Sequence, residues 1–119
     1  MFDHRKLDVY QLAIKFAAWA YEVCRRLRGR DRHIRDQFLR ASQSIALNIA
    51  EGNGRRTAAD RSNFFTIARG SALECSAIVD ILTMCAGMPE EAAEPGQEFL
   101  VRIVSMLVKL APPTGAAQE

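Results

Sequence analysis

The sequence has 119 residues, enough for one domain with a hydrophobic core and too few for two. Apolar residues make up 49% and charged residues 25%, which excludes disordered, collagen-like and low-complexity chains. The formal net charge is only +2, so the chain as a whole is not strongly basic.

The N-terminal residues and the cysteines indicate the cellular compartment of the protein. The first eight residues include Asp3, Arg5, Lys6 and Asp8 and lack the apolar segment of a secretory signal. No apolar stretch approaches the ~20 residues of a membrane-spanning helix. Cys24, Cys75 and Cys85 are an odd number without CxxC spacing, which fits neither a disulfide framework nor a zinc site. We expect a cytoplasmic protein without membrane contact. Its cysteines are expected to be small buried apolar residues, with a reactive thiol as the alternative.

The first half of the chain predicts two amphipathic helices. A capping box at Asp8 and Gln11 starts the first, and apolar residues at intervals of three and four continue it to about Arg28, before Gly29. The second helix is predicted from about residue 34 to residue 51, because apolar residues again form one stripe. The sequence Gly52-Asn53-Gly54 is expected to break it.

The second half predicts two more helices. Thr57 is the expected N-cap of the third, with Asp60 at its third helical position, and Gly87 marks its end. Residues 89–96 are expected to form an acidic loop or broken turn, and the fourth helix is predicted over about 97–110. The sequence therefore predicts an all-α, antiparallel up-down-up-down four-helix bundle over residues 1–111. Residues 112–119 are expected to be a short frayed tail.

The predicted fourth helix is apolar over more than one face. Its polar residues form one narrow stripe: Glu98, Arg102, Ser105 and Lys109. The remaining residues cover far more than the ~100° face that one side of a bundle core buries. A second burial surface, and hence self-association, is predicted.

Groups suited to catalysis are few. The chain has two histidines, and no Glu-x-x-His sequence of the kind that a di-metal carboxylate bundle requires. The Gly52-Asn53-Gly54 turn lacks the strand and the Gly-Lys-Ser/Thr sequence of a phosphate-binding loop. We expect no enzymatic activity, no metal and no cofactor.

Basic and acidic residues are unevenly distributed. Thirteen of the 16 basic residues are arginine; residues 1–70 carry a net +7 and residues 71–119 a net −5. In the predicted bundle, the arginines of the first loop lie at the same end as the acidic residues 80–98, and partial neutralisation is expected. The opposite end, with Arg55, Arg56 and Arg61, keeps a basic excess and becomes the candidate phosphate-binding surface. The alternative is that the arginines form ion pairs between neighbouring helices.

Three segments carry a family resemblance. Residues 37–55 read QFLRASQSIALNIAEGNGR, residues 7–13 read LDVYQLA, and residues 65–74 read FTIARGSALE. In this order and spacing they resemble the motifs of the 23S rRNA-intervening sequence proteins, also called four helix bundle proteins. The resemblance covers most of the chain.

The resemblance implies a ring-like homo-oligomer, with a pentamer as the expected size. In the related accessory protein of diversity-generating retroelements, such a ring binds nucleic acid and a reverse transcriptase. This chain departs from the pattern at Leu39, where an arginine commonly precedes Arg40, and in its arginine-rich first loop, where Phe-Pro is frequent. A weaker basic face is therefore expected.

The motif residues also have a physical interpretation. Gly70 and Ser71 are small enough to allow close approach of helices, and Asn48 on an apolar stripe needs a hydrogen-bond partner and is expected to fix register. Glu51 is expected to pair with Arg55, or Glu74 with Arg40. The full set of predicted structural residues is Asn48, Glu51, Gly52, Gly70, Ser71 and Glu74.

Two functional hypotheses follow. The first is an oligomeric nucleic-acid-binding accessory protein that contacts RNA or DNA through arginines near the second turn. Its predicted contact residues are Arg40, Arg55, Arg56, Arg61 and Arg69. The second is an oligomeric scaffold that docks another protein through its helix faces and binds no nucleic acid.

Overall fold

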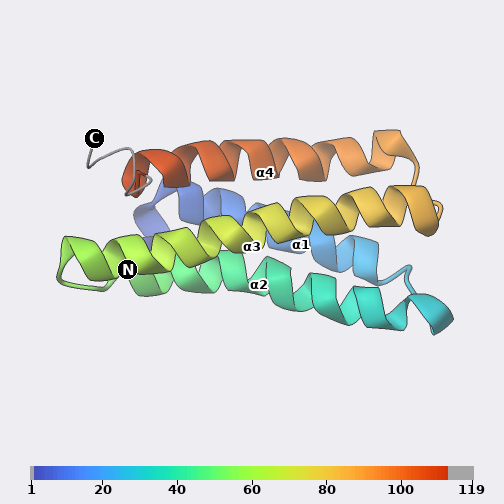
Figure 1. Cartoon of the computed structure of the whole chain (residues 1–119), viewed down its shortest axis with the longest axis horizontal. Coiled ribbons are helices and arrows are strands. Elements are labelled where there is room, and N and C mark those ends of the chain that lie inside the picture. Colours follow the sequence, from blue (N-terminus) through green and yellow to red (C-terminus); the bar gives the residue numbers. More distant parts are fainter. Residues whose placement is uncertain (1, 113–119) are drawn as a thin grey trace.

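The computed structural model describes residues 2–112, which form four long helices. These are α1 (Asp8–Cys24), α2 (Arg32–Asn53), α3 (Ala58–Cys85) and α4 (Glu90–Leu110), with short 3₁₀ helices η1 (Asp3–Lys6) and η2 (Gly29–Asp31). Each helix packs on the next and α4 packs on α1, so α2 and α4 are diagonal to each other (Figure 1). The predicted all-α four-helix architecture is confirmed. Most of the predicted tail, residues 113–119, lies outside the described residues.

The core is built from the apolar stripes that the sequence places on every helix. Phe16 of α1, Phe38 and Ile45 of α2, Leu82 of α3 and Ile103 of α4 are fully buried or nearly so. Burying a side chain of this size contributes about 1.5–3 kcal/mol, which makes these stripes the main force holding the helices together. None of the helices within residues 2–112 has the combination of length and apolar character needed to cross a membrane.

The predicted start of α3 is confirmed, whereas that of α1 differs. Thr57 Oγ1 accepts a hydrogen bond of 3.1 Å from the backbone N–H of Asp60, as an N-cap does. The capping box at Asp8 and Gln11 is wrong, because Asp8 is already helical and Leu7 holds the N-cap position. Gln11 Nε2 instead donates to the carbonyl oxygen of Arg5 at 3.0 Å.

Helix α1 ends at Cys24, one turn earlier than predicted, while α2 extends to Asn53. After Cys24 the chain tightens, because the backbone N–H groups of Arg26 and Leu27 donate to carbonyls only three residues earlier. Gly52, expected to break α2, instead lies inside it and is buried. The sequence pattern located these helices correctly but not their last turns.

The expectation of a loop over residues 89–96 is wrong, because these residues form the first turns of α4. Pro95 and Gly96 are poor helix residues, yet tertiary packing favours the helix here. A Cβ atom on Gly96 would collide with the ring of Trp19 of α1. Glycine therefore allows α4 to approach Trp19 closely, and this contact offsets the weak local propensity.

The glycine that permits close helix approach is Gly52 and not Gly70. A Cβ atom on Gly52 would come within 2.9 Å of Phe64 Cβ and of the Phe65 ring, so α2 and α3 meet tightly there. Gly70 has nothing within 4 Å of the corresponding position and is exposed. Within one chain, the close approach predicted at Gly70 is therefore wrong.

Two of the three cysteines are buried, as expected, and one is not. Burial raises the pKa of the Cys24 thiol to about 11 and that of Cys75 to about 12. Both thiols are therefore protonated at neutral pH and are weak nucleophiles. The expectation is wrong for Cys85, which is exposed near the end of α3.

Candidate nucleic-acid interface

The turn between α2 and α3 is held together by Arg61. Its Nη1 atom donates to the carbonyl oxygen of Asn53 at 2.9 Å and to that of Arg55 at 3.4 Å. Its Nη2 atom donates to Asn53 Oδ1 at 3.4 Å. The last carbonyls of a helix have no partner within the helix, so a guanidinium group in this place completes the end of α2. Arg61 therefore has a structural role that limits its contact with a ligand.

The two other arginines of this turn differ from each other. Arg55 Nη2 pairs with Glu51 at 2.8 Å, and its guanidinium lies 4.7 Å from the centre of the Phe64 ring. The expected Glu51–Arg55 pair is thus confirmed. Arg56 is exposed, and within residues 2–112 its side chain forms neither an ion pair nor a hydrogen bond. Only Arg56 of the three is wholly available for phosphate.

The family motif residues of α2 and α3 meet in a shallow polar groove. Ser44 Oγ and Ser71 Oγ are 2.8 Å apart, and the half-buried Asn48 donates from Nδ2 to the carbonyl oxygen and to Oγ of Ser44. Glu74 accepts from Gln37 Nε2 at 3.4 Å and does not pair with Arg40. The predicted need of Asn48 for a partner is met inside α2, next to Ser71 of α3.

The five arginines predicted to contact nucleic acid do not form one patch. Arg40 lines the groove between α2 and α3, beside Glu74. Arg69 lies on the opposite edge of α3, because it precedes Ser76 by two helical turns and Ser76 Oγ donates to Gln97 of α4 at 2.7 Å. Arg40 and Arg69 therefore face different sides of the bundle.

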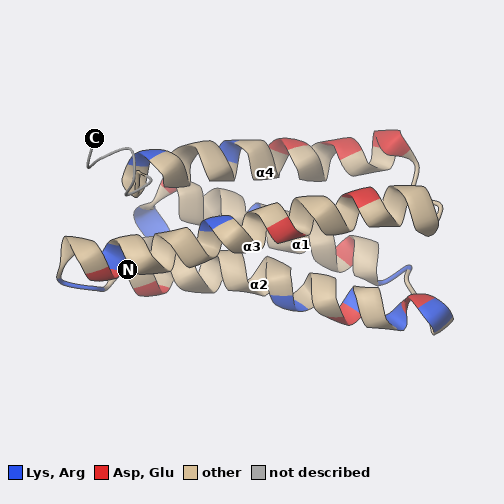
Figure 2. Ribbon diagram, viewed as in Figure 1, with Lys and Arg blue, Asp and Glu red and all other residues tan. Residues whose placement is uncertain are grey.

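The connection between α1 and α2 carries a second set of arginines. It lies at the end of the bundle where the sequence predicted less net positive charge. Arg28, Arg30 and Arg32 are exposed and form no ion pair or side-chain hydrogen bond within the part of the chain that the structure describes. Figure 2 shows basic residues in the α1–α2 connection and at the start of α2, whereas acidic residues lie along the first half of α4, which is diagonal to α2. Within residues 2–112 no ion pair joins these two groups.

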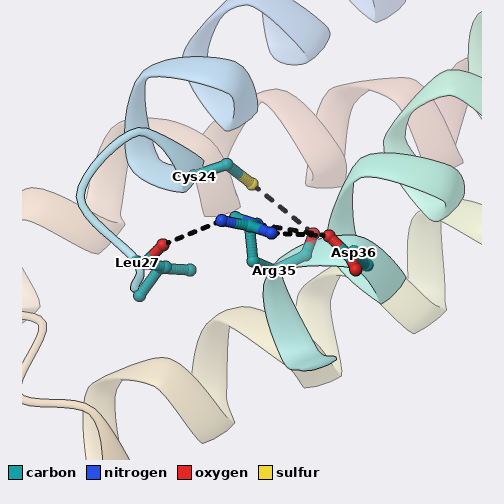
Figure 3. A network of polar contacts seen from close by, with 4 residues as sticks. All are labelled: Cys24, Leu27, Arg35 and Asp36. Carbon is teal, nitrogen blue, oxygen red and sulfur yellow. Dashed lines mark hydrogen bonds and ion pairs between the residues drawn. The ribbon is translucent and has the colours of Figure 1, made fainter. Parts of the chain in front are cut away.

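Arg35 is the exception at this end of the molecule. Its Nη1 atom donates to the carbonyl oxygen of Leu27 at 3.4 Å and its Nε atom to Asp36 Oδ1 at 3.2 Å (Figure 3). The thiol of Cys24 contacts the carbonyl oxygen of Arg35 at 3.7 Å. Arg35 thus attaches the α1–α2 connection to α2. This contact holds the connection in one position, and with it the backbone that carries the three unpaired arginines.

The outer face of α3 is apolar and exposed. Six residues spaced by three or four along its solvent side are exposed and small or apolar: Ile67, Gly70, Leu73, Ala77, Ile81 and Met84. The contact of Ser76 with Gln97 sets the antiparallel register of α3 and α4, which brings Val101 of α4, 66% exposed, level with Leu73. We call these six residues the outer face of α3.

The apolar excess predicted for α4 is mostly absorbed within the chain. Phe99, Val104 and Met106 are partly buried against the core, and only Val101 and Leu110 are strongly exposed among its large apolar residues.

Within residues 2–112, no three side chains of the His, Cys, Asp or Glu type gather in a way that could hold a metal ion.

Comparison with known proteins places the chain in a family. No curated protein sequence matches it. A crystal structure of a protein of unknown function from the S23 ribosomal protein family of Bacteroides thetaiotaomicron superposes with a TM-score of 0.82 at 22% identity, over 88% of this chain and 99% of the other. This similarity supports the fold alone. The family model of the 23S rRNA-intervening sequence proteins matches residues 5–109, so the chain belongs to that family.

Proposed function

We propose that this chain is a non-enzymatic, homo-oligomeric bundle that binds RNA or DNA through arginines left unpaired by its own fold. The observation that carries the proposal is the set Arg28, Arg30 and Arg32, exposed and without internal partners at the α1–α2 connection. Arg56 adds a free guanidinium at the other end, and Arg40 and Arg69 add two along the sides. Guanidinium groups bind phosphate oxygens through paired hydrogen bonds.

The expected absence of catalysis is supported by where the reactive groups lie. His4, in η1, packs edge-on against Tyr10 at a centroid distance of 4.8 Å, and His33 lies at the start of α2, at the other end of the bundle. Burial keeps the pKa values of Cys24 and Cys75 well above neutral, so neither thiol is an activated nucleophile. These side chains are poorly arranged for catalysis, and the exposed arginines are suited to binding.

Self-assembly increases the strength of such a basic surface. One chain has a net charge of +2, but copies arranged around an axis place several sets of unpaired arginines on one particle. The outer face of α3 supports assembly, because Met84 is 83% exposed, Leu73 55% and Ile67 50%. Contiguous apolar surface of this kind marks interfaces between proteins. The position of Gly70, open in one chain, fits the close approach of a helix from a second copy.

Nucleic-acid binding is tested by titrating labelled single-stranded RNA and duplex DNA with the protein at several salt concentrations. We expect affinity to fall steeply and linearly on a logarithmic salt scale, because phosphate contacts release counterions. A protein partner docked through apolar surface shows no such dependence. Absence of binding at 50 mM salt would contradict the proposal and would favour the scaffold, for which the exposed outer face of α3 is the supporting observation.

Assembly is tested by light scattering at micromolar concentration. The wild-type chain is expected to have a mass several times 13.3 kDa, and Leu73→Glu is expected to reduce it, because a carboxylate in the centre of an apolar interface loses its hydration. Leu47→Glu is the matched control, since Leu47 is 66% exposed on α2 and lies off the outer face of α3. A single-chain mass for the wild type would contradict assembly. Dissociation by Leu47→Glu alone would move the interface to α2.

A further inference from the structure

We propose that the pocket between the end of α1 and the α3–α4 turn binds a small carboxylate with an apolar body, such as a medium-chain fatty acid. The pocket encloses about 460 Å³. This volume lies within the range of roughly 300–1,000 Å³ that is typical of small-molecule sites. The site is separate from the arginines proposed to contact nucleic acid and does not depend on that proposal.

The walls of this pocket are apolar. Val23 comes from the end of α1 and Leu27 from the connection after it. Leu82 comes from α3, Met88 from the α3–α4 turn and Ala92 from the start of α4. Leu82 is 1% exposed and forms part of the core. An apolar group placed here would extend the hydrophobic core out of the end of the bundle, at a gain of about 0.8 kcal/mol for each methylene buried.

One wall is held rigidly by packing. The ring of Trp19 lies 5.7 Å from that of Phe16 and 6.3 Å from that of Phe38, measured between centroids. On α4, Gly96 leaves room for the Trp19 ring where any side chain would collide with it. Trp19 cannot turn away without disrupting these contacts, so the indole wall of the pocket exists before a ligand enters.

The opposite wall is a defined turn. Gly87 has a φ of 77°, and the backbone N–H of Met88 donates to the carbonyl oxygen of Leu82 at 3.2 Å. The N–H of Ala86 donates to the same carbonyl at 3.0 Å. A glycine in the left-handed region just after the last helical turn is a common helix ending, and here the bond to Leu82 also holds the turn against α3. Both walls are thus fixed, which lowers the entropic cost of binding.

Charge at the rim selects an anion. Glu22, in the last turn of α1, and Arg26, in the turn that follows the helix, both line the pocket. The carboxylate of Glu22 is paired with Arg25 at 2.8 Å, whereas Arg26 has no ion-pair partner within residues 2–112. An exposed, unpaired arginine that lines an otherwise mostly apolar hollow complements a molecule with a carboxylate head and a hydrocarbon body. A cationic ligand would not pair with Arg26, and a purely polar ligand would not fill the apolar part of the pocket.

The experiment uses the only tryptophan of the chain, which is part of the site. Octanoate and octanol are titrated separately while the emission of Trp19 is followed. We expect a saturable change with both and tighter binding of octanoate. Arg26→Gln is expected to weaken octanoate binding by about tenfold, through loss of the charge-assisted contact, and to leave octanol binding unchanged. Arg28→Gln is the matched control, because Arg28 is a nearby arginine that does not line the pocket.

A second variant tests the pocket itself. Ala92→Phe places a large side chain at an exposed position that lines the cavity, so it should fold normally and abolish the response to both ligands. An unchanged melting temperature establishes that the fold survives. An emission of Trp19 that does not respond to octanoate, or responds equally in Arg26→Gln, would overturn the proposal.

Discussion

At the α2–α3 turn the arginines complete the fold, whereas at the α1–α2 connection three of them are left free. Arg61 supplies its donors to the carbonyl oxygens of Asn53 and Arg55, and Arg55 is paired with Glu51. Arg28, Arg30 and Arg32 have no such partners within residues 2–112. Similar clusters of arginine in the sequence thus provide very different amounts of charge for a ligand.

The difference follows from how each connection ends its helix. At both ends backbone N–H groups bond to carbonyls of the last helical turn, from Gly54 and Arg55 after α2 and from Arg25 and Leu27 after α1. After α2, however, the next helix follows at once, and Arg61 from its first turn also donates to the carbonyl oxygens of Asn53 and Arg55. After α1, within residues 2–112, the closure involves no arginine side chain apart from Arg35, which contacts Leu27.

The largest expected effect comes from removing the free set. The triple variant Arg28→Ala, Arg30→Ala, Arg32→Ala should lower the salt slope of nucleic-acid binding by about three, because each lost phosphate contact lowers it by roughly one. Stability should hardly change, since surface substitutions of this kind are usually within about 0.5 kcal/mol. Salt titrations and a melting curve measure both quantities. An unchanged salt slope would assign binding to the α2–α3 turn.

The sequence was sufficient to predict the four helices but not which arginines are free. Periodic apolar residues place each helix, because burial against a common core dominates over local propensity. The same priority explains the wrong loop at 89–96, where packing on Trp19 prevails over Pro95 and Gly96. Whether a guanidinium finds a carbonyl oxygen, as Arg61 does, depends on the angle between two helices. The pattern of residues in a single sequence does not determine the angle between two helices.

The same reasoning applies to the motif glycines. Gly52 and Gly70 both belong to segments that resemble the family, but Gly52 was expected to break a helix and Gly70 to allow close packing of helices. In one chain only Gly52 is packed, against Phe64 and Phe65, while Gly70 is open. A small residue permits close approach on whichever face it lies, and the identity of the neighbour comes from the assembled structure. The light-scattering test of Leu73→Glu therefore also tests whether the helix face that contains Gly70 packs against a second copy.

A smaller effect is expected from Arg61→Ala, and it concerns stability. The substitution removes the donors that complete the end of α2, at a cost of about 2 kcal/mol for charged hydrogen bonds to otherwise unpaired carbonyls. The chain has 119 residues, between the domains of 60–100 residues that lose roughly 4–8 °C per kcal/mol and the larger ones that lose roughly 2–4 °C, so the melting temperature should fall by several degrees. Nucleic-acid affinity, measured well below the melting temperature, should change little.

Arg56→Ala is the matched control for that prediction, because Arg56 belongs to the same turn and has no internal partner within residues 2–112. It should leave the melting temperature unchanged and lower the salt slope by at most about one. If Arg61→Ala instead weakens nucleic-acid binding without lowering the melting temperature, Arg61 contacts phosphate in solution. The division between structural arginines at the α2–α3 turn and ligand-binding arginines at the α1–α2 connection would then be wrong.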